Sequence, residues 1–224
     1  MFKITYYGRD VVLKMVIICS LIFIASLFIP VFIVKVILLL LVIFLMSFTF
    51  YFFRDPERSI PEGYDDSMIL APGDGKIVIV EDIINKEDNL YAKGEPLKQI
   101  SIFLSPLNVH VNRNPTNGTV KYYNYIEGEY IVAFDHKSSD RNERTEIGIE
   151  DRMGRKVLFK QIAGFVARRI VCDLDEGSVV KAGERFGMIK FGSRVDILLK
   201  PDTEIKVKIN DIVKGGETVV AVNK

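Results

Sequence analysis

MVIICSLIFIASLFIPVFIVKVILLLLVIFLMSFTFYFF, residues 15–53, is an apolar run of 39 residues with one charged side chain, Lys35. A bilayer core is about 30 Å thick and is crossed by roughly 20 helical residues. One helix of this length would be about 58 Å long, which is too long for one span and suits two. Pro30 favours a break between the halves. The run therefore predicts two membrane helices, residues 11–29 and 33–53, with Lys35 near the turn and within reach of the lipid headgroups.

A cleaved signal peptide is the alternative for an apolar segment near the N-terminus. It fits poorly, because the apolar region of a signal peptide has about 7–15 residues and is followed by a small-residue cleavage site. Lysine and arginine gather on the cytoplasmic side of membrane spans. Five of them flank the run at the ends that a hairpin brings to one side: Lys3, Arg9, Lys14, Arg54 and Arg58. We therefore expect residues 1–53 to anchor the chain in the cell membrane and residues 54–224 to form a cytoplasmic domain.

The charges outside this run are frequent and balanced. The whole chain has 30 Lys and Arg against 29 Asp and Glu, so no basic field points to a nucleic-acid partner. Cys19 and Cys172 lie in different regions and do not resemble a disulfide framework or a metal motif. With His110 and His136 as the two histidines of the sequence, a His-rich metal site is excluded, and we expect no bound metal.

The remaining sequence consists of short segments of β type, many of which alternate apolar and polar residues between Gly, Asn, Asp or Pro turns. No long amphipathic helical pattern is evident. We expect a mainly β domain, a multi-stranded sandwich or barrel. The expected strands are residues 76–81, 99–104, 118–125, 130–134, 145–150, 156–162, 169–172, 187–191, 195–199, 204–209 and 218–222.

A weak internal repeat runs through the second half of this domain. GSVVKAGE at residues 177–184 resembles NDIVKGGE at residues 210–217, and APGDGKIV at residues 71–78 has a related turn followed by a strand. Such units recur in lipoyl- and biotinyl-like barrels, although ordinary glycine hairpins explain them equally well. A carrier function is not favoured, because no lysine lies at a hairpin tip in a Met-Lys-Met-like setting.

Four short motifs could carry chemistry, and each alone has an ordinary structural explanation. Gly192-Ser193 lies between two apolar strands, as in a common bulge, and lacks the Gly-x-Ser-x-Gly pattern of a hydrolase. Asp74 lies in a Pro-Gly-Asp-Gly turn. His110 alternates with apolar residues, as a structural histidine does. The segment Asn142–Arg144 would be a solvated charge cluster on its own.

Together and in this order, the motifs resemble the phosphatidylserine decarboxylase family in its short, membrane-anchored form, which includes archaetidylserine decarboxylase-like members. The resemblance runs from about Phe52 to the C-terminus, and the helix hairpin fits it as well. The segments that carry it are FFRDPER at 52–58, PGDG at 72–75, NVHVNR at 108–113, NER at 142–144, AGFVARRI at 163–170 and GERFGMIKFGS at 183–193.

The resemblance implies self-cleavage between Gly192 and Ser193 into a β chain, residues 1–192, and an α chain, residues 193–224. The Ser193 hydroxyl would attack the Gly192 carbonyl to form an ester, and elimination and hydrolysis would leave a pyruvoyl group at position 193. A serine hydroxyl needs a base to become a good nucleophile. By resemblance, Asp74 and His110 supply that base.

One position departs from the longer bacterial pattern, which has a second histidine three residues after the first. Here that position is Arg113, as in the short forms. Either His110 then serves both self-cleavage and decarboxylation, or Asp74 acts more directly. This leaves the division of labour open and does not change the reaction.

After maturation, the resemblance implies that the pyruvoyl ketone condenses with the substrate amine and accepts electrons as carbon dioxide leaves. His110 is then the candidate that returns a proton. Guanidinium groups recognise phosphate oxygens, although surface salt bridges are the alternative for each arginine. The candidates for binding the lipid phosphate are Arg113, Arg144, Arg168 and Arg169. His136 lies outside the family motifs and is expected to be a loop residue.

Three functions are compatible with these features. The first is a decarboxylase of a serine-headgroup lipid, either phosphatidylserine or archaetidylserine. The second is a pyruvoyl decarboxylase of a soluble amino acid, which a membrane anchor disfavours. The third is a membrane-tethered adaptor that binds partners through lipoyl-like repeats. The family suggests a homodimer, and a lipid substrate predicts that the site opens toward the bilayer, on the side of Arg54.

Overall fold

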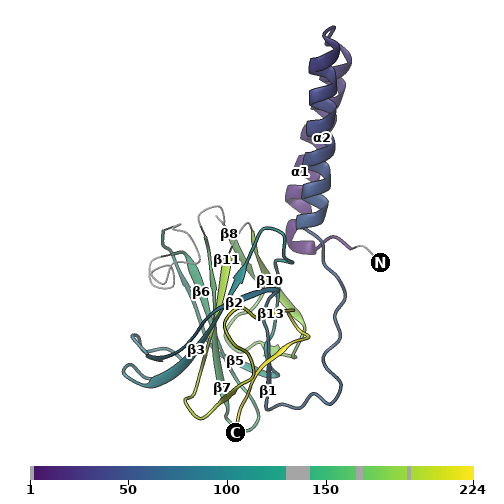
Figure 1. Cartoon of the computed structure of the whole chain (residues 1–224). Coiled ribbons are helices and arrows are strands. Elements are labelled where there is room, and N and C mark those ends of the chain that lie inside the picture. The colour runs from purple at the N-terminus through teal and green to yellow at the C-terminus, as the bar shows by residue number, and fades with distance from the viewer. Residues whose placement is uncertain (1–2, 130–141, 165–168, 191–192) are drawn as a thin grey trace. The chain divides into compact units, whose positions relative to one another are not determined.

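The structure is a computed structural model that describes residues 3–129, 142–164, 169–190 and 193–224, with Arg169 described by its backbone alone. The chain divides into two compact units, residues 1–56 and 57–224 (Figure 1). The expected strand at residues 130–134, His136, Arg168 and Gly192 lie outside the described residues.

The first unit contains the two predicted helices, which the structure confirms. After a short 3-10 turn, η1 (Tyr6–Gly8), come α1 (Arg9–Leu27) and α2 (Phe32–Phe52), each shifted by one or two residues from the expected range. Both are long and apolar enough to cross a membrane, and within the most apolar part of each only 11% and 6% of the residues are buried. A helix that is apolar on its exposed sides suits a lipid environment better than the core of a soluble protein.

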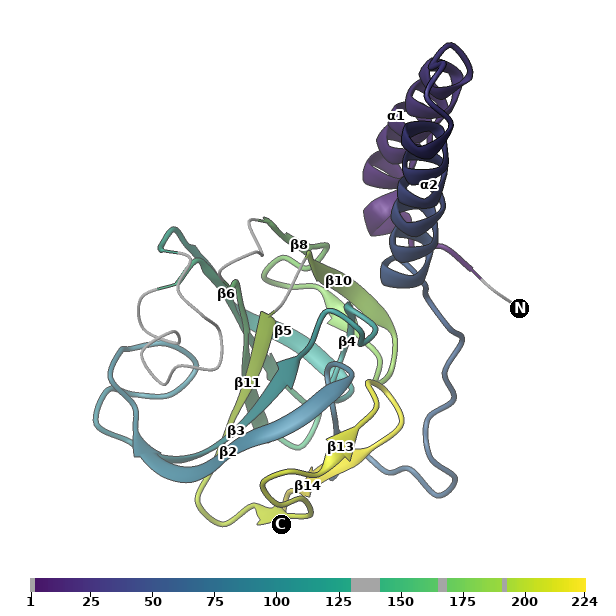
Figure 2. The same cartoon turned by 45° about the horizontal axis from the view of Figure 1, so that its top comes forward.

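The second unit is mainly β, as predicted. Its largest sheet has eight strands in the order β13-β2-β3-β11-β7-β6-β5-β9 and curls into a half-barrel (Figure 2). Two three-stranded sheets, β4-β10-β8 and β1-β14-β12, complete the described part of the unit. The strands are β1 (Met68–Leu70), β2 (Gly75–Ile84), β3 (Pro96–Leu104), β4 (Val111–Arg113), β5 (Gly118–Ile126), β6 (Arg144–Glu150), β7 (Lys156–Ile162), β8 (Arg169–Cys172), β9 (Val179–Val180), β10 (Arg185–Lys190), β11 (Ser193–Leu199), β12 (Glu204–Ile205), β13 (Ile212–Val213) and β14 (Val219–Val222).

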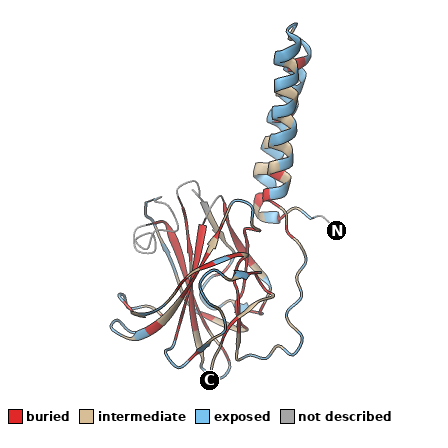
Figure 3. Cartoon of the chain, viewed as in Figure 1, coloured by how far each residue is buried: buried red, intermediate tan, exposed pale blue. Residues whose placement is uncertain are grey.

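The large sheet buries both of its faces at its centre (Figure 3). The inner face carries the main apolar core, which includes Ile102, Ile147, Phe159 and Val195. The opposite face, called the outer face below, carries a smaller apolar cluster that includes Leu158 and Leu198 and packs against Leu90 and Tyr91 of the β2–β3 loop. Because side chains alternate along a strand, neighbouring residues of β11 face opposite sides.

The internal repeat is a repeat of backbone geometry. Gly177 and Asn210, at matching positions, both have a positive φ, of 92° and 79°. Gly183 and Gly216 match in the same way, with φ values of 77° and 76°. Each unit supplies a two-residue strand, β9 or β13, followed by a tight turn. The two turns touch, since a Cβ added to Gly216 would lie 3.4 Å from the Cα of Gly183.

Candidate active site

One edge of the large sheet gathers the ends of five strands. β11 begins there at Ser193, which is opposite Leu104, the last residue of β3. β7 ends there at Ile162, which is opposite Arg144, the first residue of β6. β2 begins at the same edge, directly after Asp74. Strand pairing thus brings three motifs that are far apart in sequence to one edge.

Two chain segments cross between the large sheet and the small sheet β4-β10-β8. One links β3 to β4 and contains His110; the other connection joins the end of β10, at Lys190, to the start of β11, at Ser193, and lies outside the described residues. β4 and β10 pair antiparallel, with Met188 opposite Val111. The backbone N–H of Ile189 donates to the carbonyl of His110 at 3.4 Å. His110 therefore lies beside β10, the strand that precedes the Gly192–Ser193 bond. Its contact residue, Ile189, is three positions before Gly192 in the sequence.

Ser193 is fully buried on the inner face of the sheet, on the same side as Val195. Its Oγ has no hydrogen-bond partner within the part of the chain that the structure describes. A buried hydroxyl without a partner loses its hydrogen bonds to water, which costs free energy. Such groups in folded proteins call for an explanation, and a reactive role is one.

Asp74 is held by contacts from residues far apart in the chain. Arg58 donates from Nη2 to Oδ2 of Asp74 at 2.8 Å, and the backbone N–H of Gly215 donates to Oδ1 at 2.8 Å. The turns pack tightly here, since a Cβ added to Gly215 would lie 3.0 Å from the Cα of Gly73. The carboxylate orientation is therefore fixed. Arg58, predicted only as a charge beside the membrane segment and as part of the FFRDPER motif, lies at the site and contacts Asp74.

His110 is fully buried, and its Nδ1 lies 3.0 Å from the carbonyl oxygen of Asn108. A carbonyl oxygen can only accept a hydrogen bond, so Nδ1 carries the proton in this contact. In the neutral ring, Nε2 is then the nitrogen that can accept a proton. This tautomer suits a general base.

Asn112 and Gln161 join the strands around the site. Gln161 of β7 donates from Nε2 to Oδ1 of Asn112 at 2.9 Å, and Asn112 donates from Nδ2 to the carbonyl of Pro72 at 3.3 Å. Both amides are buried. They connect the large sheet, the small sheet and the turn that carries Asp74. Asn112 lies in the NVHVNR motif, but nothing in the sequence pointed to Gln161.

The model of the phosphatidylserine decarboxylase family matches residues 45–221, which is most of the chain. The chain belongs to the phosphatidylserine decarboxylase family. Proteins named phosphatidylserine decarboxylase proenzyme are similar to it. That of Chlorobaculum tepidum is 46% identical over 97% of both chains, and that of Chlorobium luteolum is 45% identical over 97% of this chain and 99% of its own. That of Salinibacter ruber is 49% identical over 78% of this chain and 75% of its own. The resemblance inferred from the motifs is thereby confirmed.

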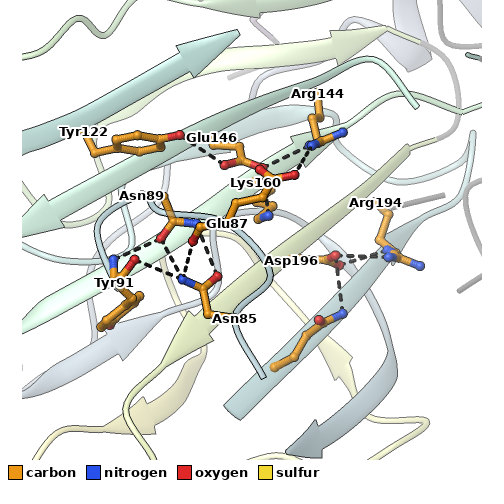
Figure 4. Close-up of polar contacts among 11 residues, drawn as sticks. Asn85, Glu87, Asn89, Tyr91, Tyr122, Arg144, Glu146, Lys160, Arg194 and Asp196 are labelled. Carbon is orange, nitrogen blue, oxygen red and sulfur yellow. Dashed lines mark hydrogen bonds and ion pairs between the residues drawn. The ribbon is translucent and has the colours of Figure 1, made fainter. Parts of the chain in front are cut away.

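The arginines proposed to bind phosphate occupy different places in this phosphatidylserine decarboxylase family member. Arg113 is buried and donates from Nη1 to the carbonyl of Gly183 at 2.9 Å. Arg144 contacts Glu146 at 3.0 Å and Glu87 at 3.4 Å on the outer face (Figure 4). Arg168 and the side chain of Arg169 lie outside the described residues. Both described guanidinium groups thus have partners within the protein.

A pocket of about 700 Å³ lies on the outer face, between the sheet and the loop that follows β2. Its lining includes Glu87, Arg144, Lys160 and Asp196. Glu146, next to this pocket, is fully buried. Burial alone would raise the pKa of its carboxyl group, but the positive charges of Lys160 and Arg144 lower that pKa below the usual value. Because Ser193 faces the other side of the sheet, this pocket is separate from the candidate site.

The second unit has one cysteine, Cys172, and its thiol is poorly suited to be a nucleophile. Burial raises the pKa of the Cys172 thiol to about 11, so it stays protonated at neutral pH. Among the described residues, no group of three or more His, Cys, Asp or Glu side chains could hold a metal ion.

Proposed function

We propose that this chain is a membrane-bound, self-processing decarboxylase that converts a serine-headgroup phospholipid, phosphatidylserine or archaetidylserine, to the ethanolamine lipid and carbon dioxide. The names of its relatives support this activity. The structural observation that carries the proposal is Ser193, a buried hydroxyl without a described partner at the start of a central strand.

Self-cleavage would begin when Oγ of Ser193 attacks the carbonyl carbon of Gly192. The amide becomes an ester, and the nitrogen of residue 193 becomes a free amine. Loss of the Cα proton of residue 193 then expels the Gly192 carboxylate and leaves dehydroalanine. Its tautomer, an imine, takes up water and releases ammonia, which leaves a pyruvoyl group. Each step is an isomerisation, an elimination or a hydrolysis, so no oxidant is needed.

Two residues are proposed to move protons in these steps. Asp74 has an orientation fixed by Arg58 and Gly215 and would assist deprotonation of Ser193. His110 has Nε2 as its proton-accepting nitrogen and lies beside β10. Among the described residues, neither side chain has a hydrogen bond to Ser193 Oγ. Catalytic hydrogen bonds often form only in the reactive complex. Asp74 and His110 therefore stay the proposed proton-transfer residues although neither is hydrogen-bonded to Ser193 here.

The strand arrangement fits a pyruvoyl group at position 193. Ser193 is paired to β3, and the next residue is paired to both β3 and β7, so the new chain end would stay in the sheet. The pyruvoyl group, when formed, supplies an electron sink for decarboxylation. His110 would return the proton to the substrate carbon. Residues 193–224 would remain bound, because β11 pairs with β3 and β7 and β14 pairs with β1, and these three partner strands belong to the other chain.

The substrate would be bound at the surface of the membrane. The two apolar helices support an anchor, and the flanking lysines and arginines support a cytoplasmic second unit. Arg113, Arg168 and Arg169 remain candidates for the lipid phosphate, whereas Arg144 pairs with Glu146 on the face opposite Ser193 and is no longer favoured. An anchor raises the local concentration of a lipid substrate. A homodimer is part of the proposal by family resemblance.

Mass spectrometry of the purified protein tests the proposal directly. We expect two fragments divided after Gly192, with a pyruvoyl group blocking the smaller one, and carbon dioxide release from vesicles that contain a serine-headgroup lipid. Parallel assays with acyl and ether lipids identify the substrate. Ser193→Ala should abolish both cleavage and activity, whereas Ser59→Ala, an exposed serine outside the site, should leave both intact. Decarboxylation by the Ser193→Ala protein would refute the mechanism.

A further inference from the structure

We propose that Arg194, through its ion pair with Asp196, is a positioning residue that holds residue 193 in place for self-cleavage. This inference rests on the proposed function, because it concerns the Gly192–Ser193 bond. The family motif that contains Gly192 and Ser193 ends at Ser193, and Arg194 is the residue that follows it.

The ion pair is buried on the outer face of β11. Arg194 Nε lies 2.9 Å from Oδ1 of Asp196, and Arg194 Nη2 donates to Oδ2 at 3.0 Å (Figure 4). The two side chains are 0% and 2% exposed. Gln99 of β3 donates from Nε2 to Oδ2 of Asp196 at 3.4 Å, which ties the pair to the neighbouring strand. The Nη2–Oδ2 contact is a charge-assisted hydrogen bond, whereas the close approach of Nε to Oδ1 lacks hydrogen-bond geometry and is an ionic contact. Together they hold the two groups against each other on this face.

This arrangement determines which face of the sheet receives Ser193. Side chains alternate along β11, so Ser193 and Val195 share the inner face, and Arg194 and Asp196 share the outer one. A slip of β11 by one residue would turn both charged groups into the apolar core. Burying charges there is strongly unfavourable. The alternation of charged and apolar residues therefore fixes the direction in which Oγ of Ser193 points.

Positioning explains the pair better than stability does. A buried ion pair is seldom more stable than well-packed apolar side chains of the same volume. Its best-attested use is to specify register. Here the charged residue directly follows the serine, at the end of a strand that the proposed reaction disconnects from β10. Ends of strands open locally more easily than their centres, so an anchor at the second residue is where it has the greatest effect on residue 193.

The experiment follows cleavage in newly synthesised full-length chains inserted into vesicles. We expect Arg194→Met to slow cleavage by at least about tenfold, since misplacement of reacting groups carries penalties of that size. Arg194→Lys should cleave itself much faster than Arg194→Met, because lysine keeps the positive charge beside Asp196. The double variant Arg194→Met with Asp196→Leu removes both charges, so it avoids a lone buried carboxylate and keeps the test valid if the single variant misfolds. Arg155→Met, which breaks the Arg155–Asp151 pair in the turn between β6 and β7, is the matched control.

Hydroxylamine separates positioning from later steps, because it cleaves the ester intermediate and leaves an unmodified Ser193 at the new N-terminus. If Arg194 positions the attacking hydroxyl, its variants form less ester and hydroxylamine does not restore cleavage. Restoration by hydroxylamine, or wild-type cleavage in a folded double variant, would overturn the inference. An uncut wild-type chain would instead overturn the proposed function, so the two failures are distinguishable.

Discussion

Arg58 and Asp74 form an ion pair of 2.8 Å that joins the FFRDPER motif to the turn before β2. The other guanidinium nitrogen of Arg58 contacts Glu217 at 3.1 Å. Arg58 and Asp74 lie on the β-chain side of the proposed cleavage point, and Glu217 lies on the α-chain side. The ion pair would therefore become part of a contact between two chains after self-cleavage.

Replacing Arg58 should impair self-cleavage through Asp74. We expect Arg58→Met to slow cleavage about tenfold or more, because the Asp74 carboxylate loses its 2.8 Å contact with Arg58, one of the contacts that orient it. Arg185→Met is the control, since Arg185 forms an ion pair with the largely exposed Glu57, and such pairs contribute about 1 kcal/mol or less. The measurement is the fraction of chain cleaved with time. If Arg58→Met and Arg185→Met cleave themselves at the same rate, Arg58 does not assist self-cleavage through Asp74 and has a structural role alone.

Gly216 should tolerate a side chain less well than Gly154. Their φ values are 76° and 78°, so alanine costs about 1–2 kcal/mol of backbone strain at both positions. At Gly216 the new Cβ would also lie 2.8 Å from Cδ of Arg113, whereas at Gly154 nothing lies within 4 Å. Crowding of this kind adds about 1–3 kcal/mol.

The comparison is made by the free energy of unfolding of Gly216→Ala and Gly154→Ala in detergent. Because the strain is shared, the difference between the variants isolates the contact with Arg113. Equal losses would mean that Arg113 moves aside at no cost, and the tight packing of the two repeat turns would then be unimportant for stability.

The sequence allowed most of the fold to be predicted. Length and the lack of charge identified α1 and α2 without any helical periodicity, and alternation identified strands such as β7 and β11. The strands that were missed, including β4 and β13, have two or three residues each. Segments so short show no period of their own, since they form by pairing with a strand that is already in place.

The candidate site was predictable only in part. Asp74, His110 and Ser193 lie in motifs that can be recognised locally. The contacts Arg58–Asp74 and Gln161–Asn112 join residues 16 and 49 positions apart. They arise from the order and register of strands, which no local pattern encodes. The outer-face engagement of Arg144 was missed for the same reason.

Glu146 should stabilise the protein in a pH-dependent way. Its pKa is lowered in the folded state, against burial, by Lys160 and Arg144. A carboxyl group with a lowered folded pKa stabilises above its unfolded pKa, near 4.5, and loses this contribution as the pH falls through the folded pKa. We therefore expect Glu146→Gln to lose about 3–5 kcal/mol at pH 7, as for a broken buried ion pair, and less at pH 3.

Thermal unfolding between pH 3 and pH 7 measures this difference. Glu204→Gln is the control, because Glu204 also pairs with a lysine, Lys206, but at an exposed position. Its removal should change the melting temperature little at any pH. A gap between Glu146→Gln and the wild type that stays constant over the whole range would show that packing, and not ionisation, is lost.

Removing the two apolar helices should separate self-cleavage from action on a bilayer. The residues that surround Ser193 belong to the second compact unit, which begins at Glu57. A chain of residues 57–224 should therefore cleave itself and remain soluble. It should decarboxylate a short-chain serine lipid dispersed in micelles at close to the full-length rate. On vesicles it should be slower by at least about tenfold, because the anchor no longer raises the local substrate concentration. The full-length protein assayed on both lipid forms is the control. Equal loss on micelles and vesicles would mean that the helices support the site itself, and no loss on vesicles would mean that the β domain binds the bilayer without them.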